Sequence, residues 1–374
     1  MKFTKPNKTR KLIHIIPTNK WGGVQTYAYD ICRHYLESGW DVMALTRNAV
    51  GVDTPFANAG VRLLHAPVRG FFDVASAMTL ARHLRREGVG NETVIHTHRY
   101  RDAFTALIAK KLSKRTDIRI VNTRHSVRPG RDTWIFRKLY KLLDAHIFVS
   151  QMAYDGFIGH AGRQLDLPKE RIHILHNSLF LDDFTPTPEP THGPVVALYQ
   201  GALVKGKGLE SLIDAMELLK KVKIRLRISG TGNPDYLDML RRRAMMRDVM
   251  DTIDWNIKAK PSLETCEDAH FGVIPSTERE AFSLESLRFM AAMRPQIATL
   301  HGAQSEYLKE GKDAFLVEPG NVTALADAMR RLATDRELRL SMGYCAYKDF
   351  MRNMSWTSFI NQLNNIYIDK IATE

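Results

Sequence analysis

The stretch VVALYQGALVKGKGLESLIDAMELLKK, residues 195–221, contains a strand, a loop and a helix in that order. Its first part, VVALYQG, is a short apolar run rich in β-branched and aromatic residues, which is typical of a buried strand. Its last part, GLESLIDAMELLKK, repeats leucine, isoleucine and methionine at helical spacing. The glycines and lysines between them suit a flexible loop. A strand followed by a loop and a helix is the repeating unit of a doubly wound α/β fold.

The same alternation extends in both directions from this stretch. Toward the N-terminus the sequence reads LIHIIP then GVQTYAYDICRHYLE, VIHTH then DAFTALIAKKL, and further strands at IRIVNTRH, HIFVS and RIHILHN. Toward the C-terminus it continues with IRLRISG, FGVIPS, QIAT and AFLVEP, with helical stretches between, and then ALADAMRRLAT. Alternation on this scale favours parallel strands joined by crossover helices. We therefore predict two similar Rossmann-like α/β domains, one after the other.

A proline-rich segment marks the expected boundary between the two domains. TPTPEPTHGP, residues 185–194, can continue neither a helix nor a central strand. We expect a first domain over residues 1–185 and a second over residues 186–355. The closing residues, 356–374, should form a helix with one apolar face, which would pack across a domain surface.

The net charge of +13 is unevenly divided along the chain. Residues 1–185 hold 29 Lys and Arg against 16 Asp and Glu, whereas the remainder holds 25 of each. The basic clusters KKLSKR (110–115) and RKLYKLL (137–143) share helices with leucine and tyrosine, which suits an anionic membrane surface or an anionic acceptor. Nucleic acid is a competing partner for a basic half, and a solvated helix face is the plain alternative for any one cluster. We expect peripheral contact with an anionic membrane and no nucleic acid partner.

The sequence contains no candidate membrane span or secretion signal. No run approaches the roughly 20 apolar residues that a spanning helix needs, and the start, MKFTKPNKTRKLIHIIP, lacks an apolar signal region. We expect a cytoplasmic protein that can lie at the inner face of the plasma membrane. The three cysteines are far apart, which argues against a disulfide framework or a zinc site. His96 and His98 are expected to point to opposite faces of their strand and so not to share a metal ion.

Polar residues that follow strands are the best site candidates, because ligands of doubly wound sheets bind beyond the carboxyl ends of the strands. Gly22 and Gly23 open the first helix and would let backbone N–H groups approach an anion. Lys205 and Lys207 lie in the loop GALVKGKG, which suits phosphate but lacks the Gly-Lys-Ser/Thr pattern of ATP-hydrolysing enzymes. His125, in NTRHS, can hydrogen-bond a substrate hydroxyl or phosphate at the end of its strand.

The stretch TEREAFSLESLRFMAAMRP, residues 277–295, supplies a fourth loop. Glu280 precedes a helix that we expect to begin near Ser283. The N–H groups of residues 282–284 would then be free to bind an anion, beside a carboxylate that accepts hydrogen bonds from sugar hydroxyls. Stabilisation of the helix start is a simpler explanation for Glu278 and Glu280, but it does not account for the phosphate-suited lysine loop. Together the loops favour a ligand that is part phosphate and part polyol.

With these loops placed, the sequence resembles the retaining glycosyltransferases of family 4, which have the GT-B fold. The resemblance runs through WGGVQTY, H-N-S at 176–178, GALVKGKG, SGTG at 229–232, PSTEREAFSLESLRFMAAMRP and GAQSEYL at 302–308 to the final tryptophan helix. It implies two Rossmann-like domains that face a central cleft, with the C-terminal helix crossing back to the first domain. The first domain would hold the acceptor and the second a nucleotide-sugar donor, with no obligatory metal or other cofactor.

The resemblance also implies roles for individual residues. Three would be catalytic: His125 beside the transferred sugar, Lys207 on the departing diphosphate and Glu280 on the sugar hydroxyls. The donor site would comprise Gly22, Gly23, Gly201, Lys207, Gly230, Phe282, Ser283, Leu284, Glu285 and Arg288. The acceptor site would include His98, Arg99 and Arg124. Retention in this family is ascribed to front-face attack, in which the leaving phosphate helps to deprotonate the acceptor, so no protein nucleophile is expected.

Two positions depart from the family pattern. Ala202 stands where the family has an arginine that binds the diphosphate, and Arg288 stands where it has a second glutamate, which commonly holds the ribose. A guanidinium only donates hydrogen bonds, so it cannot replace that carboxylate. Arg288 could supply the missing cation to the diphosphate, or Glu285 could pair with it or take over the ribose contact. Loss of donor binding is the third alternative.

The function that we expect is transfer of a hexose, with retention, from a UDP- or GDP-sugar to a glycan or lipid-linked acceptor. Surface polysaccharide, lipopolysaccharide or glycolipid assembly is the expected setting. A non-catalytic protein of the same fold that binds membrane or polyanion is the alternative from another class, and a nucleotide-sugar epimerase is the alternative enzyme.

Overall fold

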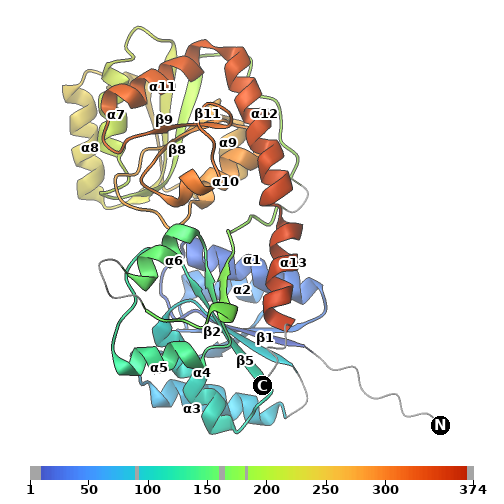
Figure 1. Cartoon of the computed structure of the whole chain (residues 1–374). Helices are drawn as coiled ribbons and strands as arrows, with labels where there is room; N and C mark the ends of the chain where they lie inside the picture. Colours follow the sequence, from blue (N-terminus) through green and yellow to red (C-terminus); the bar gives the residue numbers. More distant parts are fainter. Residues whose placement is uncertain (1–9, 89–91, 160–164, 182–183, 369–374) are drawn as a thin grey trace. The chain divides into compact units, whose positions relative to one another are not determined.

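The computed structural model of the chain describes residues 10–88, 92–159, 165–181 and 184–368. They form two compact units, one made of the described residues up to 175 together with 360–368, and the other of the described residues from 176 to 359. In this part of the chain every paired strand is parallel to its neighbour, and helices alternate with the strands (Figure 1). The prediction of two doubly wound α/β domains is confirmed.

The first unit is built on a seven-stranded sheet in the order β3-β2-β1-β4-β5-β6-β7. Its strands are β1 (Lys11–Ile15), β2 (Asp41–Thr46), β3 (Arg62–His65), β4 (Thr93–Thr97), β5 (Ile118–Arg124), β6 (Ala145–Phe148) and β7 (Ile172–Ile174). Its helices are α1 (Gly23–Glu37), α2 (Val50–Asn58), α3 (Val74–Arg86), α4 (Tyr100–Ser113), α5 (Trp134–Leu142) and α6 (Gln151–Ile158). β1 and β4 are buried along their whole length, as central strands of a sheet covered on both faces are.

The second unit is built on a six-stranded sheet in the order β10-β9-β8-β11-β12-β13. Its strands are β8 (Val195–Leu203), β9 (Ile224–Gly232), β10 (Ile253–Ile257), β11 (Phe271–Ile274), β12 (Gln296–Thr299) and β13 (Ala314–Val317). Its helices are α7 (Leu209–Glu217), α8 (Pro234–Met246), α9 (Leu263–Glu267), α10 (Leu284–Ala291), α11 (Val322–Thr334) and α12 (Arg336–Asn353). The strand, loop and helix predicted over residues 195–221 are thus β8, the loop after it and α7.

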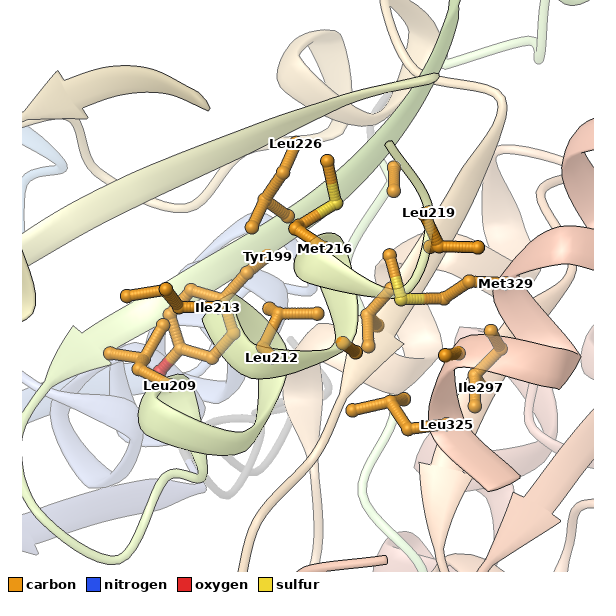
Figure 2. Packing of buried hydrophobic residues seen from close by; sticks show 14 of the residues in the cluster. Tyr199, Leu209, Leu212, Ile213, Met216, Leu219, Leu226, Ile297, Leu325 and Met329 are labelled. Carbon is orange, nitrogen blue, oxygen red and sulfur yellow. The ribbon is translucent and has the colours of Figure 1, made fainter. Parts of the chain in front are cut away.

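Apolar side chains fill both faces of the second sheet. One core cluster joins β8 and β9 to α7, α8 and α11, and includes Leu212, Met216 and Met329 (Figure 2). The other joins the sheet to α9, α10 and α12, and includes Phe289 and Phe350. Because helices cover both faces, polar side chains that meet a ligand have to come from the loops at the ends of the strands.

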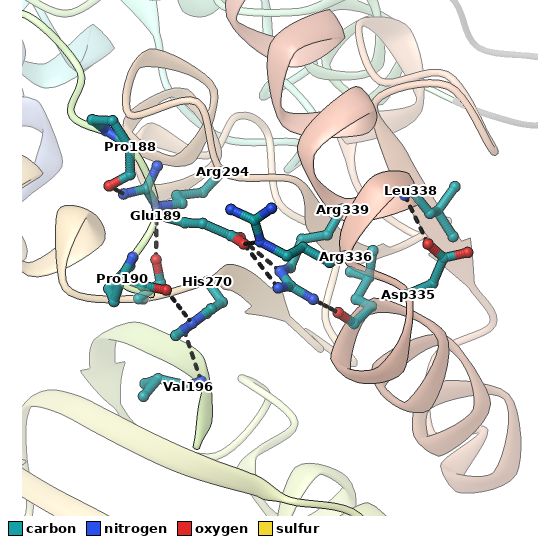
Figure 3. A network of polar contacts seen from close by, with 12 residues as sticks. Pro188, Glu189, Pro190, Val196, His270, Arg294, Asp335, Arg336, Leu338 and Arg339 are labelled. Atoms are coloured by element: carbon teal, nitrogen blue, oxygen red, sulfur yellow. Dashed lines mark hydrogen bonds and ion pairs between the residues drawn. The ribbon is translucent and has the colours of Figure 1, made fainter. Parts of the chain in front are cut away.

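The proline-rich segment packs on the second unit (Figure 3). Glu189 is buried and accepts hydrogen bonds from Arg339 at 2.7 and 2.9 Å, and Arg336 lies 3.2 Å from the same carboxylate. The carbonyl of Pro190 lies 3.1 Å from Nε2 of His270. A buried carboxylate needs such partners, because an unpaired charge in the interior is strongly destabilising. These contacts hold the segment against the second unit.

The last helix, α13 (Trp356–Ile368), begins in the second unit and belongs to the first unit from residue 360 onward. Its apolar side is buried. In the first unit the hydroxyl of Tyr367 lies 2.5 Å from Nδ1 of His96, at the centre of the sheet. Residues 369–374 of the expected closing segment lie outside the described residues. Within the described residues, no helix is long and apolar enough to span a bilayer.

Candidate functional site

Two loops of the second unit meet where the strand order reverses. The order changes direction between β8 and β11, and ligands of doubly wound sheets bind beyond the carboxyl ends of the strands at such a point. The loop after β8 carries Lys207, and the loop after β11 carries Glu280. The backbone N–H groups of Thr277 and Glu278 donate to the carbonyl of Gly206 at 2.9 and 3.2 Å, which ties the two loops together.

Lys207 and Glu280 form an ion pair between these loops. The ammonium of Lys207 donates to Oε1 of Glu280, which also accepts from the hydroxyl of Ser276. The second carboxylate oxygen, Oε2, accepts from Nε2 of Gln304 at 3.2 Å. The side chain of Lys207 is 32% exposed, whereas that of Glu280 is 11% exposed. The carboxylate is therefore held by three side chains, and the lysine is the more accessible partner of the pair.

Lys207 keeps its charge at neutral pH. Burial alone would lower its pKa, but the carboxylates of Glu280, Glu285 and Glu278 outweigh burial, so the pKa is raised above its ordinary value. Within the described residues only one of its three N–H donors has a partner. The other two can serve a phosphate oxygen.

Gly201 and Gly230 let the ends of β8 and β9 approach closely. They are paired in the register of the two strands, and their φ values are positive, 148° and 155°. A Cβ on Gly230 would lie 1.8 Å from the carbonyl oxygen of Gly201, so a larger residue cannot be accommodated without a shift of the backbone. Gly201 also lies beside Glu285, because its Cβ would be 3.9 Å from Cγ of that residue. The structure therefore brings these three expected donor residues together.

The N-terminus of α10 follows Glu280 directly, and the expected helix start is confirmed. Ser283 caps the helix, since its hydroxyl accepts from the N–H of Ser286 at 3.2 Å. Among the described residues, the N–H groups of Phe282 and Leu284 have no hydrogen-bond partner. These two amides lie at the positive end of the helix, where an anion is favoured.

Arg288 pairs with Glu285 one turn along α10. Nη1 of Arg288 lies 3.7 Å from Oε1 of Glu285, and the arginine side chain is only 13% exposed. Burial raises the pKa of the Cys266 thiol to about 12, and the positive charge of Arg288 opposes this rise, which places the guanidinium close to the interior. The pairing that the sequence left as one alternative is present. A contact between Arg288 and a diphosphate stays a prediction.

The first sheet reverses its strand order between β1 and β4, and the expected glycines follow β1. Gly22 has an extended backbone and precedes α1, which begins at Gly23. Nε1 of Trp21 donates to Oγ1 of Thr26 at 3.1 Å and so anchors the first turn of the helix. An anion can approach a helix start of this kind through its backbone N–H groups. Contact of these glycines with the donor phosphate stays a prediction.

Three histidines form a hydrogen-bonded row at the carboxyl ends of β1, β4 and β5. Nδ1 of His14 lies 3.0 Å from Nε2 of His98, and Nδ1 of His98 lies 3.2 Å from Nε2 of His125. The ring of Tyr27 packs edge-on against that of His125, with 4.9 Å between their centres. His14 and His98 are buried, and His125 is the partly exposed end of the row. Both ring nitrogens of His98 are used within the row.

The expectation that His96 and His98 point to opposite faces is wrong. Residues two apart along a strand share a face, and the two rings stack with 4.8 Å between their centres. His96 is committed elsewhere, since its ring nitrogens lie 2.5 Å from the hydroxyl of Tyr367 and 2.7 Å from that of Thr123. In the part of the chain that the structure describes, no group of three or more His, Cys, Asp or Glu side chains is arranged to hold a metal ion.

Burial keeps the histidines of the row neutral. It lowers the pKa of His14 to about 3 and that of His98 well below its ordinary value. Burial also lowers the pKa of His125 to about 3, and the charges of Arg124 and Arg99 act in the same direction. At neutral pH, His125 is therefore a hydrogen-bonding group and not a cation.

The row also has a preferred direction. A neutral imidazole carries a single N–H. If His14 and His98 carry it on Nδ1, each ring donates to the next, and His125 is left with its N–H on Nδ1. The opposite direction would put an N–H on Nε2 of His14, which is buried and has no partner among the described residues. Because an unpaired buried N–H is costly, the first direction is favoured, and His125 is a donor at its outer nitrogen.

Arg99 and Arg124, the expected acceptor residues, both line a hollow of about 620 Å³ in the first unit. Each is next in sequence to a histidine of the row. The guanidinium of Arg124 lies 5.9 Å from the ring centre of Tyr100 and 5.4 Å from that of Phe157, and it donates to the carbonyl of Arg128 at 2.7 Å. The two arginines therefore lie together at the carboxyl ends of β4 and β5.

Sequence reasoning missed several residues that shape these sites. Ser276 and Gln304, which hold Glu280, lie in the quoted stretches PSTEREAF and GAQSEYL, after β11 and β12. Their place after neighbouring strands was a usable signal. His14 pairs in register with His96 on the adjacent strand, which a single sequence does not reveal.

Two protein-family models match the chain. The model described as Glycosyltransferase Family 4 matches residues 21–182. The model described as Glycosyl transferases group 1 matches residues 183–349. The matches follow one another along the chain and together span both halves.

Relatives and solved structures point the same way. A glycosyltransferase of Methanocaldococcus jannaschii is 24% identical over 94% of this chain and 95% of that protein. N-acetyl-alpha-D-glucosaminyl L-malate synthase of Bacillus anthracis is 24% identical over 81% of this chain and 81% of that protein. The crystal structure of Anabaena HepE in complex with UDP and glucose has a TM-score of 0.80 at 16% identity, covering 96% of this chain and 100% of that one. At this identity the structural likeness shows a shared fold, which is GT-B.

Proposed function

Since the chain belongs to the group 1 glycosyltransferases, with a first half of glycosyltransferase family 4, we propose that it transfers a hexose from a UDP- or GDP-sugar to a glycan or lipid-linked acceptor. The setting that we propose is surface polysaccharide, lipopolysaccharide or glycolipid assembly in the cytoplasm. The observation that carries the proposal is the Lys207–Glu280 pair at the reversal point of the second sheet. The UDP and glucose in the Anabaena structure support a nucleotide-sugar donor.

In this proposal the donor diphosphate lies between Lys207 and the start of α10. There the two remaining N–H donors of Lys207 and the amides of Phe282 and Leu284 would donate hydrogen bonds to the oxygens of the diphosphate. Donors fixed in place before the reaction stabilise charge as it develops on a leaving group. Glu280 holds the lysine in position and can accept a hydrogen bond from a sugar hydroxyl.

The step that we propose is front-face attack with retention. The acceptor oxygen forms a bond to the anomeric carbon while the bond between that carbon and the diphosphate oxygen breaks on the same face of the sugar. The acceptor proton passes to the leaving diphosphate, which departs as UDP or GDP. His125 would orient the transferred sugar through its outer N–H. The proposal requires no metal, because Lys207 and the helix start supply the positive charge.

Turnover of a nucleotide-sugar panel tests this proposal. The purified chain is incubated with UDP-glucose, UDP-galactose, UDP-N-acetylglucosamine and GDP-mannose, with and without EDTA, and release of UDP or GDP is measured. We expect one donor to be turned over in both conditions, and NMR of the released or transferred sugar to show the donor's anomeric configuration. Interconversion of donor sugars without nucleotide release would instead identify an epimerase. Silence across the panel, with intact vesicle binding, would identify a non-catalytic binding protein.

We also propose that the first unit meets an anionic membrane surface through an apolar groove. The groove has a volume of about 880 Å³, and its lining includes Phe72, Trp134, Lys111, Lys114 and Lys138. Trp134 is 74% exposed and Phe72 is 60% exposed. Exposed aromatic side chains beside lysines suit the headgroup region of an anionic bilayer. This groove gives a specific location to the basic clusters of the first half of the sequence.

A further inference from the structure

The hollow in the first unit is lined by more arginines than the two, Arg99 and Arg124, that were expected to bind the acceptor. Six of the residues that line it are arginines: Arg69, Arg99, Arg101, Arg124, Arg128 and Arg131. Among the described residues that line the hollow, none is acidic. We call this feature the arginine hollow. Arginine presents its N–H groups in a planar fork that matches two oxygens of a phosphate or carboxylate.

Carboxylates near the arginine hollow compensate its charge only in part. Asp102 is buried, and its Oδ1 lies 3.5 Å from Nε of Arg101. Burial raises the pKa of Asp102 to about 7, against the opposing effect of nearby arginines, so this carboxyl is only partly ionised at neutral pH. Asp73 accepts hydrogen bonds from the backbone N–H groups of Arg69 and Ser76, so it serves the backbone at the start of α3.

Aromatic rings hold two of the guanidiniums in place. That of Arg131 lies 5.0 Å from the ring centre of Phe71 and 5.5 Å from that of Phe136. That of Arg124 lies over Phe157. Stacking on a ring fixes the plane of a guanidinium and leaves its N–H edge available to a ligand. Among the described residues, no hydrogen bond is donated by the guanidiniums of Arg69, Arg99, Arg128 and Arg131, which line the hollow.

The positive charge of the arginine hollow affects the pKa of a neighbouring side chain, Arg47. Burial lowers the pKa of Arg47, and Arg101, Arg99 and Arg69 lower it as well. Like charges held this close repel one another and oppose folding, so an anionic ligand would relieve an existing strain. A set of independently solvated surface arginines would not be expected to converge on one hollow from three separate segments, those at the carboxyl ends of β3, β4 and β5.

We propose that the arginine hollow binds a phosphate or pyrophosphate group carried by the acceptor. Arg99 directly follows β4 and Arg124 ends β5, so the hollow lies where ligands of the first sheet are expected. Its volume is within the range of about 300 to 1,000 Å³ for small-molecule sites. That the bound molecule is the acceptor rests on the proposed function. The hollow adds that this acceptor carries a phosphate or pyrophosphate group.

Calorimetric titration with inorganic pyrophosphate tests the arginine hollow directly. Wild type is compared with Arg128→Gln/Arg131→Gln and with a matched control, Arg82→Gln/Arg85→Gln, which removes the same charge from exposed positions on α3. Excess UDP is present to occupy the donor site. We expect the first variant to weaken pyrophosphate binding about tenfold or more, because it removes charge-assisted hydrogen bonds. The control should change it less than about twofold.

Equal pyrophosphate affinity in all three proteins, or none detectable in the wild type, would overturn the proposal. Arg99→Gln is a second hollow variant with the same expected weakening, should the double variant have a lowered melting temperature. UDP binding is measured separately and should be the same in every variant. Absent binding of both UDP and GDP, with a normal pyrophosphate result, would count against the donor proposal and leave the arginine hollow supported.

Competition identifies the source of the phosphate group. Geranyl pyrophosphate represents a lipid-linked acceptor, and glucose 1-phosphate represents a soluble phosphorylated sugar. Displacement of pyrophosphate from the wild type by either compound would support the proposal and would show whether the phosphate group comes from a lipid-linked or a soluble acceptor. That compound should bind Arg128→Gln/Arg131→Gln more weakly than the wild type. Failure of both compounds to displace pyrophosphate would contradict an acceptor-bound phosphate.

Discussion

His125 illustrates how buried neighbours set the chemistry of a single side chain. Its ring is linked to His98 and through it to His14, and burial keeps all three neutral. A neutral donor at the outer nitrogen can form a hydrogen bond to a hydroxyl without adding a positive charge. Because the pKa values of these rings are lowered in the folded state, acid destabilises the fold.

Replacing His14 with glutamine should reduce the acid sensitivity of folding. The pKa of folded His14 is about 3, whereas an unfolded histidine titrates near about 6.5, so between these values only the unfolded state binds the proton. The stability contribution is therefore full above about pH 6.5 and falls with pH toward 3, by about 1.4 kcal/mol per pH unit. Urea unfolding of wild type and His14→Gln from pH 7 to pH 4 measures this difference. Equal pH dependence in the two proteins would refute the buried neutral row.

Some site residues could be predicted from the sequence. Others could not, because their contacts depend on how distant segments of the chain come together. Lys207 and Glu280 lie in loops between recognisable strands and helices, so their charge and position were visible. His14 could not be placed, because its contact depends on the register between two strands far apart in sequence. The arginine hollow was also hidden, since its residues come from separate segments of the chain that only the folded sheet brings together. Arg99 and Arg124 were expected only as acceptor-binding residues, through family resemblance.

At the scale of elements, the close pairing of β8 and β9 at their carboxyl ends depends on glycine. Gly230→Ala should destabilise the second unit by about 2 kcal/mol or more, because its Cβ would meet the carbonyl oxygen of Gly201 and its φ is positive. Gly51→Ala is the control, since its Cβ meets nothing within 4 Å and its position in α2 favours alanine. Chemical unfolding of both variants tests this contrast. Equal stability of Gly230→Ala and wild type would show that the strand ends can separate freely.

Most elements followed from apolar patterning, and the exceptions have physical causes. β8 and α7 were expected where they occur. β3 and β10 were not expected, because each is an edge strand that is half-exposed and carries charged residues. β2 is buried, but its sequence DVMALT includes methionine and alanine, which are good helix formers, and so lacks a clear strand signature.

At the scale of the whole molecule, the proposed membrane contact can be tested at the apolar groove of the first unit. Trp134→Ala should weaken binding to vesicles of phosphatidylcholine with phosphatidylglycerol about tenfold, because burying an aromatic side chain in the interface contributes about 1.5 kcal/mol. Met246→Ala, which removes an exposed apolar side chain from the second unit, is the control. Co-sedimentation measures both, and vesicles without phosphatidylglycerol should bind neither variant nor wild type well. If Trp134→Ala binds like wild type, the groove is not the contact surface.

The central claim is that a nucleotide diphosphate is held by Lys207 in the second unit. Calorimetric titration of UDP and GDP into wild type, Lys207→Met and the neighbouring Lys205→Met tests it most directly. We predict that at least one nucleotide binds the wild type and Lys205→Met alike, and binds Lys207→Met about tenfold more weakly or worse, as loss of a charge-assisted hydrogen bond implies. Undiminished binding to Lys207→Met, or no binding of either nucleotide to the wild type, would contradict the account.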